Sequence, residues 1–324
     1  MPSLMRRGLL AACAVTFLAA PLAQAQDWPT KPVRMIVPIG PGSAPDVIAR
    51  LLADRLGTLW NQAVVVDNKP GAGGIPGMSA LANAGGDGYT IGFVPAAMAT
   101  ITPLVYKTPQ FNVDTQLQAV ATVGISPLML VAPANAPFNT LPELEKYAKA
   151  HPGKVNFGAP QLNSLPHLAG EMLSKAGGLG FYTVPYANPP AAITAALSGD
   201  VAVTADGIPG VQQHVKAGKL KALGVTTATR VPGYESIPAV AETYPGYEAI
   251  GWFQVMVPAG VPAARVEALN RDVNAVLRQP DVVKQLNELG VYPQQGTPAA
   301  ARDFLAGQRQ VMKKIVAELG LQQQ

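Results

Sequence analysis

The chain has 324 residues, of which 48% are hydrophobic and 14% are charged, with 24 basic and 20 acidic side chains. The formal net charge is only +4, aromatic residues make up 6%, and Lys and Arg form no clusters, so we expect neither a nucleic acid nor an anionic membrane surface as a partner. The length favours two lobes over one.

The first 25 residues have the pattern of a secretory signal. Two arginines at 6–7 precede an apolar stretch at 8–20, and residues 23–25 read Ala-Gln-Ala, a small-x-small cleavage pattern. We predict cleavage after Ala25 and a periplasmic location. Removing the two arginines leaves 22 basic side chains against 20 acidic ones, so the mature chain is nearly balanced in charge.

A lipoprotein box at 10–13 is an alternative reading of the same segment. Cleavage before Cys13 leaves only Gly8 to Ala12 after Arg7, which is short for an apolar signal region. Because Cys13 is the only cysteine, cleavage after Ala25 removes it, and a hydrophobic core has to hold the mature chain without disulfides.

Strands and helices alternate after the signal. Apolar runs predict strands at 33–37, 63–68 and 89–94, with helices at 46–56 and 77–84 between them. Strands joined by crossover helices run in the same direction, so a parallel sheet is expected.

Two long apolar stretches, 120–132 and 247–258, have no helical period and are expected to be strands that lead into a second lobe and back. Further strands are predicted at 154–160, 201–206 and 220–227, and helices at 140–151, 189–198, 209–217, 262–278, 280–289 and 298–319.

These elements predict an α/β fold of two lobes, each a mostly parallel sheet flanked by helices. Lobe 1 is expected to be discontinuous, at 26–125 and 253–324, and lobe 2 to span 126–252. Two crossover strands would join the lobes.

Catalytic groups are sparse. Of the three histidines, His151, His167 and His214, only His167 lies beside a candidate ligand loop. There is no histidine–glutamate pair at metal-ligand spacing and no nucleophile elbow, so no metal or cofactor is expected.

The turn after the first strand could bind an anion. Gly40 and Gly42 match a dinucleotide fingerprint, but Pro45 stands where the third glycine belongs, and Asp67 is the nearest acid at the expected distance, so a nucleotide stays an alternative. A helix that starts near Asp46 leaves free N–H groups, which bind carboxylates as well as phosphates. Asp46 would either cap this helix or organise the loop.

Two further turns, at 95–100 and 158–164, have the same strand–turn–helix form. Asn163 and Ser164 are hydrogen-bonding candidates in the second of them. No Lys or Arg lies in any of the three turns, so backbone amides and hydroxyls are the expected donors.

A series of motifs carries a family resemblance. These are "WPTKPVRMIVPIGPGSAPDVIARLLADRL", "VVVDNKPGAGG", "DGYTIGF", "VPY", "HVKAGKLKALGVTT", "PGYEAIGW" and "VMVPAGVP". In this order they resemble the Bug-type extracytoplasmic receptors of tripartite tricarboxylate transporters. The resemblance implies a monomeric, two-lobed Venus flytrap receptor in the periplasm, without a cofactor, that delivers a small carboxylate to a membrane permease.

The resemblance also implies two loops that pinch the ligand, Ile39 to Asp46 and Gly158 to His167. Asp206 matches an acidic position that faces the cleft, although a helix cap is an equal alternative for it. The expected ligand-binding residues are Ile39, Gly42, Ser43, Ala44, Asp46, Ala96, Ala97, Gly158, Asn163, Ser164, His167 and Asp206.

The chain departs from the family pattern in both loops and after "VPY". Residues 42–46 read Gly-Ser-Ala-Pro-Asp where the family has more glycines and a threonine; residues 159–163 are bulkier than usual, and 187–190 read Ala-Asn-Pro-Pro in place of Lys-Gly. Fewer hydroxyls predict a less polar ligand, an aromatic or longer aliphatic carboxylate. The alternative function is a hydrolase-like periplasmic enzyme that uses the same cleft, with His167 as base and Asp206 as its partner.

Overall fold

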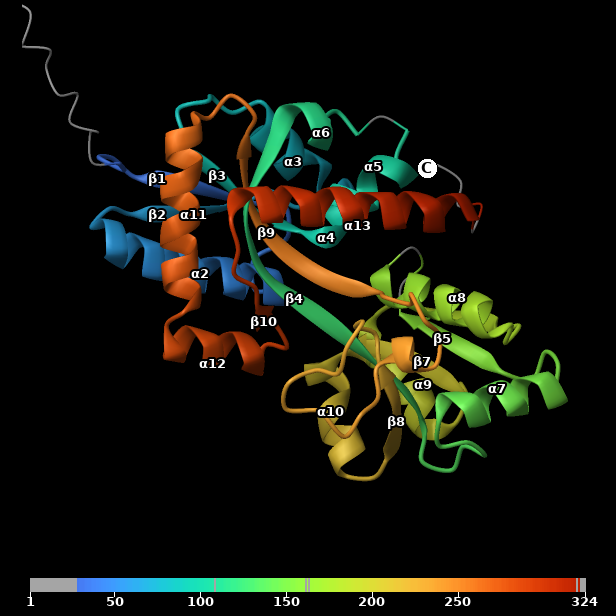
Figure 1. Ribbon diagram of the computed structural model, residues 1–324. Coiled ribbons are helices and arrows are strands. Elements are labelled where there is room, and N and C mark those ends of the chain that lie inside the picture. The colour runs from blue at the N-terminus through green and yellow to red at the C-terminus, as the bar shows by residue number, and fades with distance from the viewer. Residues whose placement is uncertain (1–27, 108, 161, 163, 319, 321–324) are drawn as a thin grey trace, which may run out of the picture.

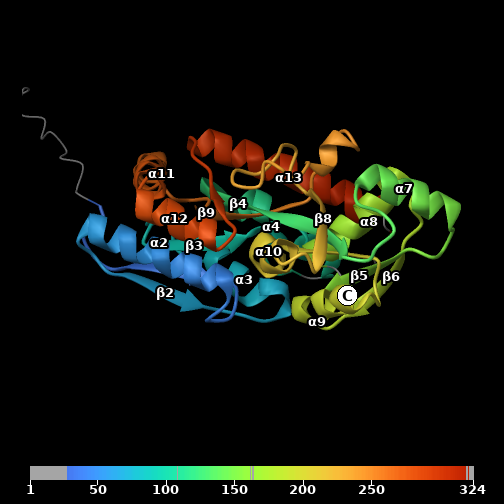
Figure 2. The same cartoon turned by 90° about the horizontal axis from the view of Figure 1, so that it is seen from below.

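The computed structural model describes residues 28–107, 109–160, 162, 164–318 and 320. The predicted signal and its cleavage site lie outside these residues. Two groups of strands and helices lie side by side, and two long strands, β4 (Leu117–Pro133) and β9 (Ile250–Pro258), run between them (Figure 1). Seen from below, α2 and β2 lie at one end of the molecule and α7 at the other (Figure 2).

The first lobe contains both ends of the described chain. Its strands are β1 (Val33–Val37), β2 (Val64–Asn68), β3 (Thr90–Pro95) and β10 (Tyr292–Pro293). Its helices are α2 (Ala44–Trp60), η1 (Ala72–Gly74), α3 (Ile75–Ala82), α4 (Ala96–Thr100), α5 (Thr102–Val105), α6 (Val113–Gln116), α11 (Ala263–Leu277), α12 (Pro280–Glu288) and α13 (Pro298–Glu318).

The second lobe is formed by the middle of the chain. Its elements are α7 (Leu141–Ala150), β5 (Asn156–Pro160), α8 (Leu165–Gly177), β6 (Tyr182–Tyr186), α9 (Pro189–Ser198), β7 (Val203–Gly207), α10 (Ile208–Lys216), β8 (Leu220–Val225) and η2 (Val240–Glu242).

The sheet of each lobe is mixed. In the first lobe, β2, β1 and β3 are parallel, whereas β9 is antiparallel to β3 and β4, and β10 is antiparallel to β4. In the second lobe, β7, β5 and β6 are parallel and β4 is antiparallel to both β7 and β8. The predicted two-lobed α/β fold is confirmed, and the parallel pairing holds for the strands that helices connect. The crossover strands pair antiparallel because one enters the second lobe and the other returns from it.

Strand β4 belongs to both sheets. It pairs with β9 from Leu117 opposite Pro258 to Pro127 opposite Ile250, and from Leu128 onwards it pairs with β7. The change of partner between Pro127 and Leu128 marks where the chain passes from one lobe to the other.

A separate hydrophobic core supports each lobe. In α2, Ile48, Leu52 and Leu56 recur every four residues, so they share one face of the helix, which packs on β1 together with α11. The second core packs side chains such as Phe157 of β5 and Leu173 of α8. Fully burying one such side chain contributes about 1.5–3 kcal/mol.

The lobes also touch outside the crossover strands. Leu168 of α8 is fully buried in a cluster with residues of α4, α5 and α13, and Lys175 forms an ion pair with Glu318 at 2.7 Å. Elsewhere, Gly290 lies so close to Pro209 that a Cβ at Gly290 would be 2.5 Å from the proline ring. Two helical faces of the lobes are therefore in contact.

Some sequence predictions need correction. The segment 95–100, predicted as a turn, forms helix α4 directly after β3, and α2 is longer than predicted at both ends. Strand β6 was not predicted, because a short strand that is partly exposed and contains Pro185 gives a weak strand signal. Within the described residues, no helix has both the length and the apolar character to cross a membrane.

Candidate ligand-binding site

The loop between β1 and α2 is organised by Asp46. The N-cap of α2 is Ser43, so Asp46 stands in the first turn, and its side chain is only 2% exposed. Its carboxylate reaches back to accept a hydrogen bond from the backbone N–H of Gly42 at 2.8 Å. Gly42 has a φ of 79°, in the left-handed region that favours glycine. Asp46 thus holds the loop, and the alternative that it is a plain N-cap is wrong.

Two further residues complete this network, and the sequence analysis missed both. Asn68, at the end of β2, donates to Asp46 Oδ1 at 2.8 Å and to the carbonyl oxygen of Ile39 at 3.0 Å. Arg50 donates through Nε to Asp46 Oδ2 at 3.0 Å and through Nη2 to Asn68 Oδ1 at 2.9 Å. Because β1 and β2 pair in parallel with Val37 opposite Asn68, the ends of both strands meet at this loop.

The network sets the charge of Asp46. Burial alone raises the pKa of this carboxyl, but the hydrogen bonds from Arg50, Asn68 and Gly42, together with the charge of Arg50, outweigh burial and bring the pKa below its ordinary value of 3.8. Asp46 is therefore ionised at neutral pH. The guanidinium of Arg50 donates its hydrogen bonds to Asp46 and Asn68.

The same loop presents backbone donors. Within the described residues, the amides of Ser43, Ala44 and Asp46 have no hydrogen-bond acceptor, and Ala44 is exposed. The Ser43 hydroxyl donates to the carbonyl oxygen of Gly40 at 2.8 Å, so its proton is used inside the loop. The start of a 17-residue helix also carries a partial positive charge. This geometry suits a carboxylate or another oxyanion.

Ala96 and Ala97 begin α4, immediately after β3. Both are half-buried. Since β3 is parallel to β1, with Ile36 opposite Gly92, these residues lie at the same edge of the first sheet as the Asp46 loop. The structure thus groups the five predicted residues of the first loop and both alanines at one edge.

In the second predicted loop, Gly158 and Ser164 are already hydrogen-bonded within the protein. Gly158 is buried inside β5, where its carbonyl oxygen accepts a hydrogen bond from Thr204 at 2.7 Å. Ser164 caps α8: its hydroxyl donates to the carbonyl oxygen of Pro160 at 2.6 Å and accepts from the His167 amide at 3.4 Å. Asn163 lies outside the described residues.

His167 is held within α8. Its ring is buried, and Nε2 lies 3.5 Å from the Glu171 carboxylate one turn along the helix. Burial lowers the pKa of His167, and Glu171 opposes that shift only in part, so the ring is neutral at pH 7. Glu171 also accepts a hydrogen bond from Thr183 at 2.5 Å. Glu171 is thus a carboxylate partner of His167 within α8.

Asp206 is the last residue but one of β7, and the following Gly207 is the N-cap of α10, so the alternative that Asp206 caps that helix is wrong. Burial raises the pKa of Asp206, and the single hydrogen bond from the Gly207 amide offsets this only in part. Its carboxylate lies against Gly210, where a Cβ would collide with Oδ2. No Lys or Arg forms an ion pair with it among the described residues.

The residues predicted in the second lobe also gather at one edge. β5 and β7 are parallel, with Gly158 opposite Thr204, so the loops after both strands emerge on the same side. In open parallel sheets this carboxyl edge is where ligands bind. No cluster of three His, Cys, Asp or Glu side chains suited to a metal is found in the part of the chain that the structure describes.

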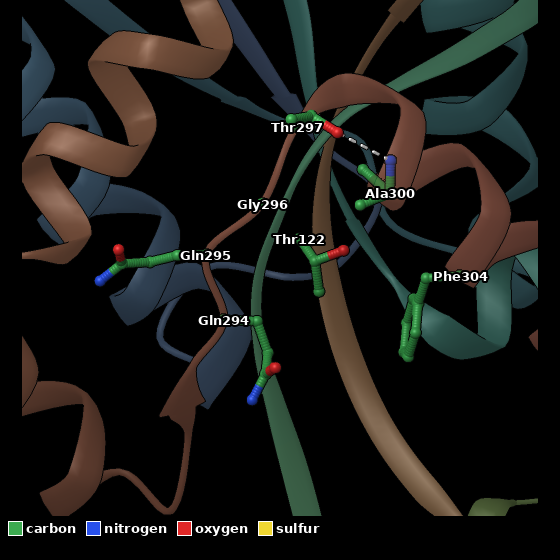
Figure 3. A pocket seen from close by; sticks show the side chains of 8 residues that line it. Thr122, Gln294, Gln295, Gly296, Thr297, Ala300 and Phe304 are labelled. Atoms are coloured by element: carbon green, nitrogen blue, oxygen red, sulfur yellow. Dashed lines mark hydrogen bonds between the residues drawn. The ribbon is translucent and has the colours of Figure 1, made fainter.

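A small cavity lies elsewhere, beside β4 in the first lobe (Figure 3). It measures about 190 Å³ and is lined by Thr122, Gln294, Gln295, Gly296, Thr297, Ala300, Ala301 and Phe304. It is smaller than the roughly 300–1,000 Å³ usual for ligand sites. None of the twelve predicted ligand residues lines it.

Comparisons with known proteins identify the family of this chain. Residues 48–321 match the family model described as "Tripartite tricarboxylate transporter family receptor". The chain is 35% identical over 306 residues to "Protein BugT" of Bordetella pertussis, which covers 94% of this chain and 93% of BugT. These matches confirm the family resemblance predicted from the motifs.

Two solved structures are similar to the whole described fold. One, from R. palustris, is Rpa4515 with adipate, with a TM-score of 0.75 and 30% identity over 92% of this chain and 100% of that chain. The other is the periplasmic binding protein BugD, with a TM-score of 0.71 and 30% identity over the same shares.

Proposed function

This chain belongs to the tripartite tricarboxylate transporter receptor family, and we propose that it captures a small carboxylate between its two lobes and delivers it to a membrane permease of the tripartite type. The proposed lobes are 26–125 with 253–324, and 126–252. The receptor works as a monomer outside the cytoplasm, after export directed by residues 1–25 and cleavage after Ala25.

The observation that carries this proposal is the loop held by Asp46. It presents the amides of Ser43, Ala44 and Asp46 without acceptors, at the positive end of α2. Each hydrogen bond to a charged oxygen is worth roughly 1.5–3 kcal/mol. With donors from the second lobe, and after the cost of ordering, such bonds can reach micromolar affinity, about −8 kcal/mol, without an arginine.

The proposed ligand-binding set has two halves. The first lobe supplies Ile39, Gly42, Ser43, Ala44, Asp46, Ala96 and Ala97; the second supplies Gly158, Asn163, Ser164, His167 and Asp206. Asp46 acts as a positioning residue in this set, because its carboxylate is buried and points back into the loop. Closure of the lobes excludes water and strengthens the hydrogen bonds to the ligand, and ligand drives closure only by binding the closed form more tightly.

The ligand we propose is an aromatic or longer aliphatic carboxylate. Alanines and prolines replace hydroxyls and glycines in both loops. Asp206 adds a second reason, because this half-buried carboxylate has no cationic partner among the described residues and repels a further ligand carboxylate placed beside it. The relative Rpa4515, with adipate, is an example of an aliphatic carboxylate in a related receptor.

The test is thermal unfolding of the purified protein with a panel of mono-, di- and tricarboxylates, aromatic and aliphatic, and with nucleotides as controls. Ligand at about 1,000 times its Kd adds about 4 kcal/mol to stability. Each kcal/mol moves the midpoint by about 2–4 °C in a domain of about 150–250 residues. A shift with one class of carboxylate is expected, and the ligand should be recovered chemically unchanged. A shift with nucleotides alone, or turnover of the ligand, would contradict the proposal.

A further inference from the structure

A second and larger cavity lies where the two lobes meet, on surfaces that the proposed carboxylate site does not use. It measures about 730 Å³, within the range of small-molecule sites. Its walls come from α11, α12 and segment 292–295 of the first lobe and from segment 227–232 of the second, with Ile125 of β4 between them. We name it the hinge groove, because β4 passes from one sheet to the other beside it.

One arginine that lines the hinge groove has no partner for its side chain among the described residues. Arg278, exposed at the end of α11, has no ion pair and no side-chain hydrogen bond among the described residues. Arg230 on the opposite wall is bound by Glu242 through two hydrogen bonds of 2.8 Å. Glu248 is the one carboxylate that lines the groove, and Gln308 donates to it at 3.4 Å. Arg278 is therefore the cation of the lining whose guanidinium has no partner among the described residues.

Neutral donors and an apolar floor accompany this cation. Asn287, Gln294 and Gln295 line the groove, and both glutamines also line the small cavity of Figure 3. Leu277, Val283 and Tyr292 supply apolar surface. An adjoining cavity of about 710 Å³ shares Val283, Asn287 and Tyr292 with the groove and adds Lys216, a second cation without an ion pair among the described residues.

We propose that the hinge groove is a second binding site, for an organic carboxylate whose charged end meets Arg278 and whose apolar body lies on Leu277, Val283 and Tyr292. A guanidinium offers two parallel donors that match the two oxygens of a carboxylate. This inference goes beyond the proposed function, since none of the residues assigned to the carboxylate site lines the groove.

Occupancy of the groove is coupled to the arrangement of the lobes. Because its walls belong to both lobes, a ligand there contacts different surfaces in each arrangement and favours the one it binds more tightly. The lobes are already in contact nearby, where Gly290 meets Pro209. The site is thus placed to act as an effector site on the closure that the first site uses.

Isothermal titration calorimetry of the purified protein tests this proposal, with benzoate, adipate and inorganic phosphate as probes. Arg278→Gln should weaken one carboxylate-binding component roughly 10- to 150-fold, the range for a hydrogen bond to a charged group. Arg302→Gln is the matched control, because Arg302 is also exposed and has no side-chain partner in the part of the chain that the structure describes, but lies outside the groove. Glu248→Gln should tighten the same component, because it removes the one negative charge of the lining.

The outcomes separate the alternatives. The component that depends on Arg278 should persist in Asp46→Ala, which changes only the first site. Identical isotherms for wild type and Arg278→Gln overturn the proposal, as does an equal loss in both arginine variants, which shows an effect of net charge alone. Binding of phosphate but of neither carboxylate overturns the assigned ligand class, and so does weaker binding in Glu248→Gln.

Discussion

Two carboxylates, the buried Asp46 and the half-buried Asp206, lie near the carboxyl ends of parallel strands, one in each lobe, and their surroundings shift their pKa values in opposite directions. Asp46 accepts hydrogen bonds from Gly42, Asn68 and Arg50, and its pKa lies below the ordinary value. Asp206 accepts one hydrogen bond, from Gly207, and its pKa lies above the ordinary value. Three donors and the charge of Arg50 outweigh desolvation at Asp46, whereas desolvation outweighs the single donor at Asp206.

The difference assigns different roles to the two lobes. The carboxylate of Asp46, in the first lobe, accepts its hydrogen bonds from within the loop network and holds the backbone amides in place. The acid in the second lobe is kept at a cost to stability, because a partly desolvated charge that has no cationic partner among the described residues is unfavourable. Residues retained at such a cost are frequent in binding sites.

The largest effect is expected for Asp46→Ala. The change removes the ionised acceptor of three hydrogen bonds, from the Gly42 amide, Asn68 Nδ2 and Arg50 Nε, and we expect a loss of about 2–4 kcal/mol in the free energy of unfolding at pH 7. Urea unfolding followed by circular dichroism measures it. Asp54→Ala on the exposed side of the same helix is the control and should change stability by less than about 0.5 kcal/mol. Equal effects of the two changes would contradict the role of Asp46 in the loop.

A smaller loss is expected for Asn68→Ala, since Asp46 keeps its bonds from Gly42 and Arg50. Three hydrogen bonds disappear, the two that Asn68 donates to Asp46 and to the Ile39 carbonyl and the one that it accepts from Arg50, and we expect a loss of about 1–2 kcal/mol. Chemical unfolding gives the value, with the exposed Asn83→Ala as control. If Asn68→Ala and Asn83→Ala are equally stable, the Asn68 bonds do not support the loop.

Asp206→Asn should change the free energy of unfolding the least of the three substitutions, and it should raise it where the other two lower it. Removing a desolvated charge should stabilise the free protein at pH 7 by about 0.5–2 kcal/mol, the usual size of a stabilising substitution. The midpoint of thermal unfolding measures the gain, with the exposed Asp303→Asn as control. A loss of stability at pH 7 would mean that a cationic partner, absent from the described contacts, compensates Asp206.

The pH dependence of these effects should also be opposite. Because the folded-state pKa of Asp46 is lowered, its contribution is complete above the ordinary pKa of 3.8 and is lost as the pH falls through the lower folded value. Because the folded-state pKa of Asp206 is raised, its cost is absent below 3.8 and grows as the pH rises from there through the higher folded value. Unfolding of wild type, Asp46→Ala and Asp206→Asn between pH 3 and pH 7 measures both trends, and parallel profiles would contradict the comparison.

The two lobes also differ in how much the sequence revealed. The strand–turn–helix pattern around 33–56 predicted the first loop and its helix, since apolar periodicity and a glycine turn are local signals. Arg50 could have been recognised from its spacing of four residues to Asp46 on one helix. Asn68 could have been recognised from the expected parallel pairing of the first two strands, whose ends meet.

Other features depend on contacts that local patterns do not encode. The spacing of four residues on one helix could predict the pairing of His167 with Glu171. The burial of the His167 ring, however, depends on packing against other elements. The hinge groove joins α11 and α12 with segment 227–232, which are far apart in the chain and brought together only by the arrangement of the lobes. Four-residue helices such as α5 and α6 are too short to give a periodic signal.

The affinity of Asp46→Ala for the best carboxylate of the panel tests the central claim most directly. Isothermal titration calorimetry should show binding weakened at least about tenfold relative to wild type, because the loop no longer holds its amides in place. Asp54→Ala, with the same charge removed from the same helix, should bind like wild type. A folded Asp46→Ala protein with wild-type affinity would show that the first loop does not form the carboxylate site.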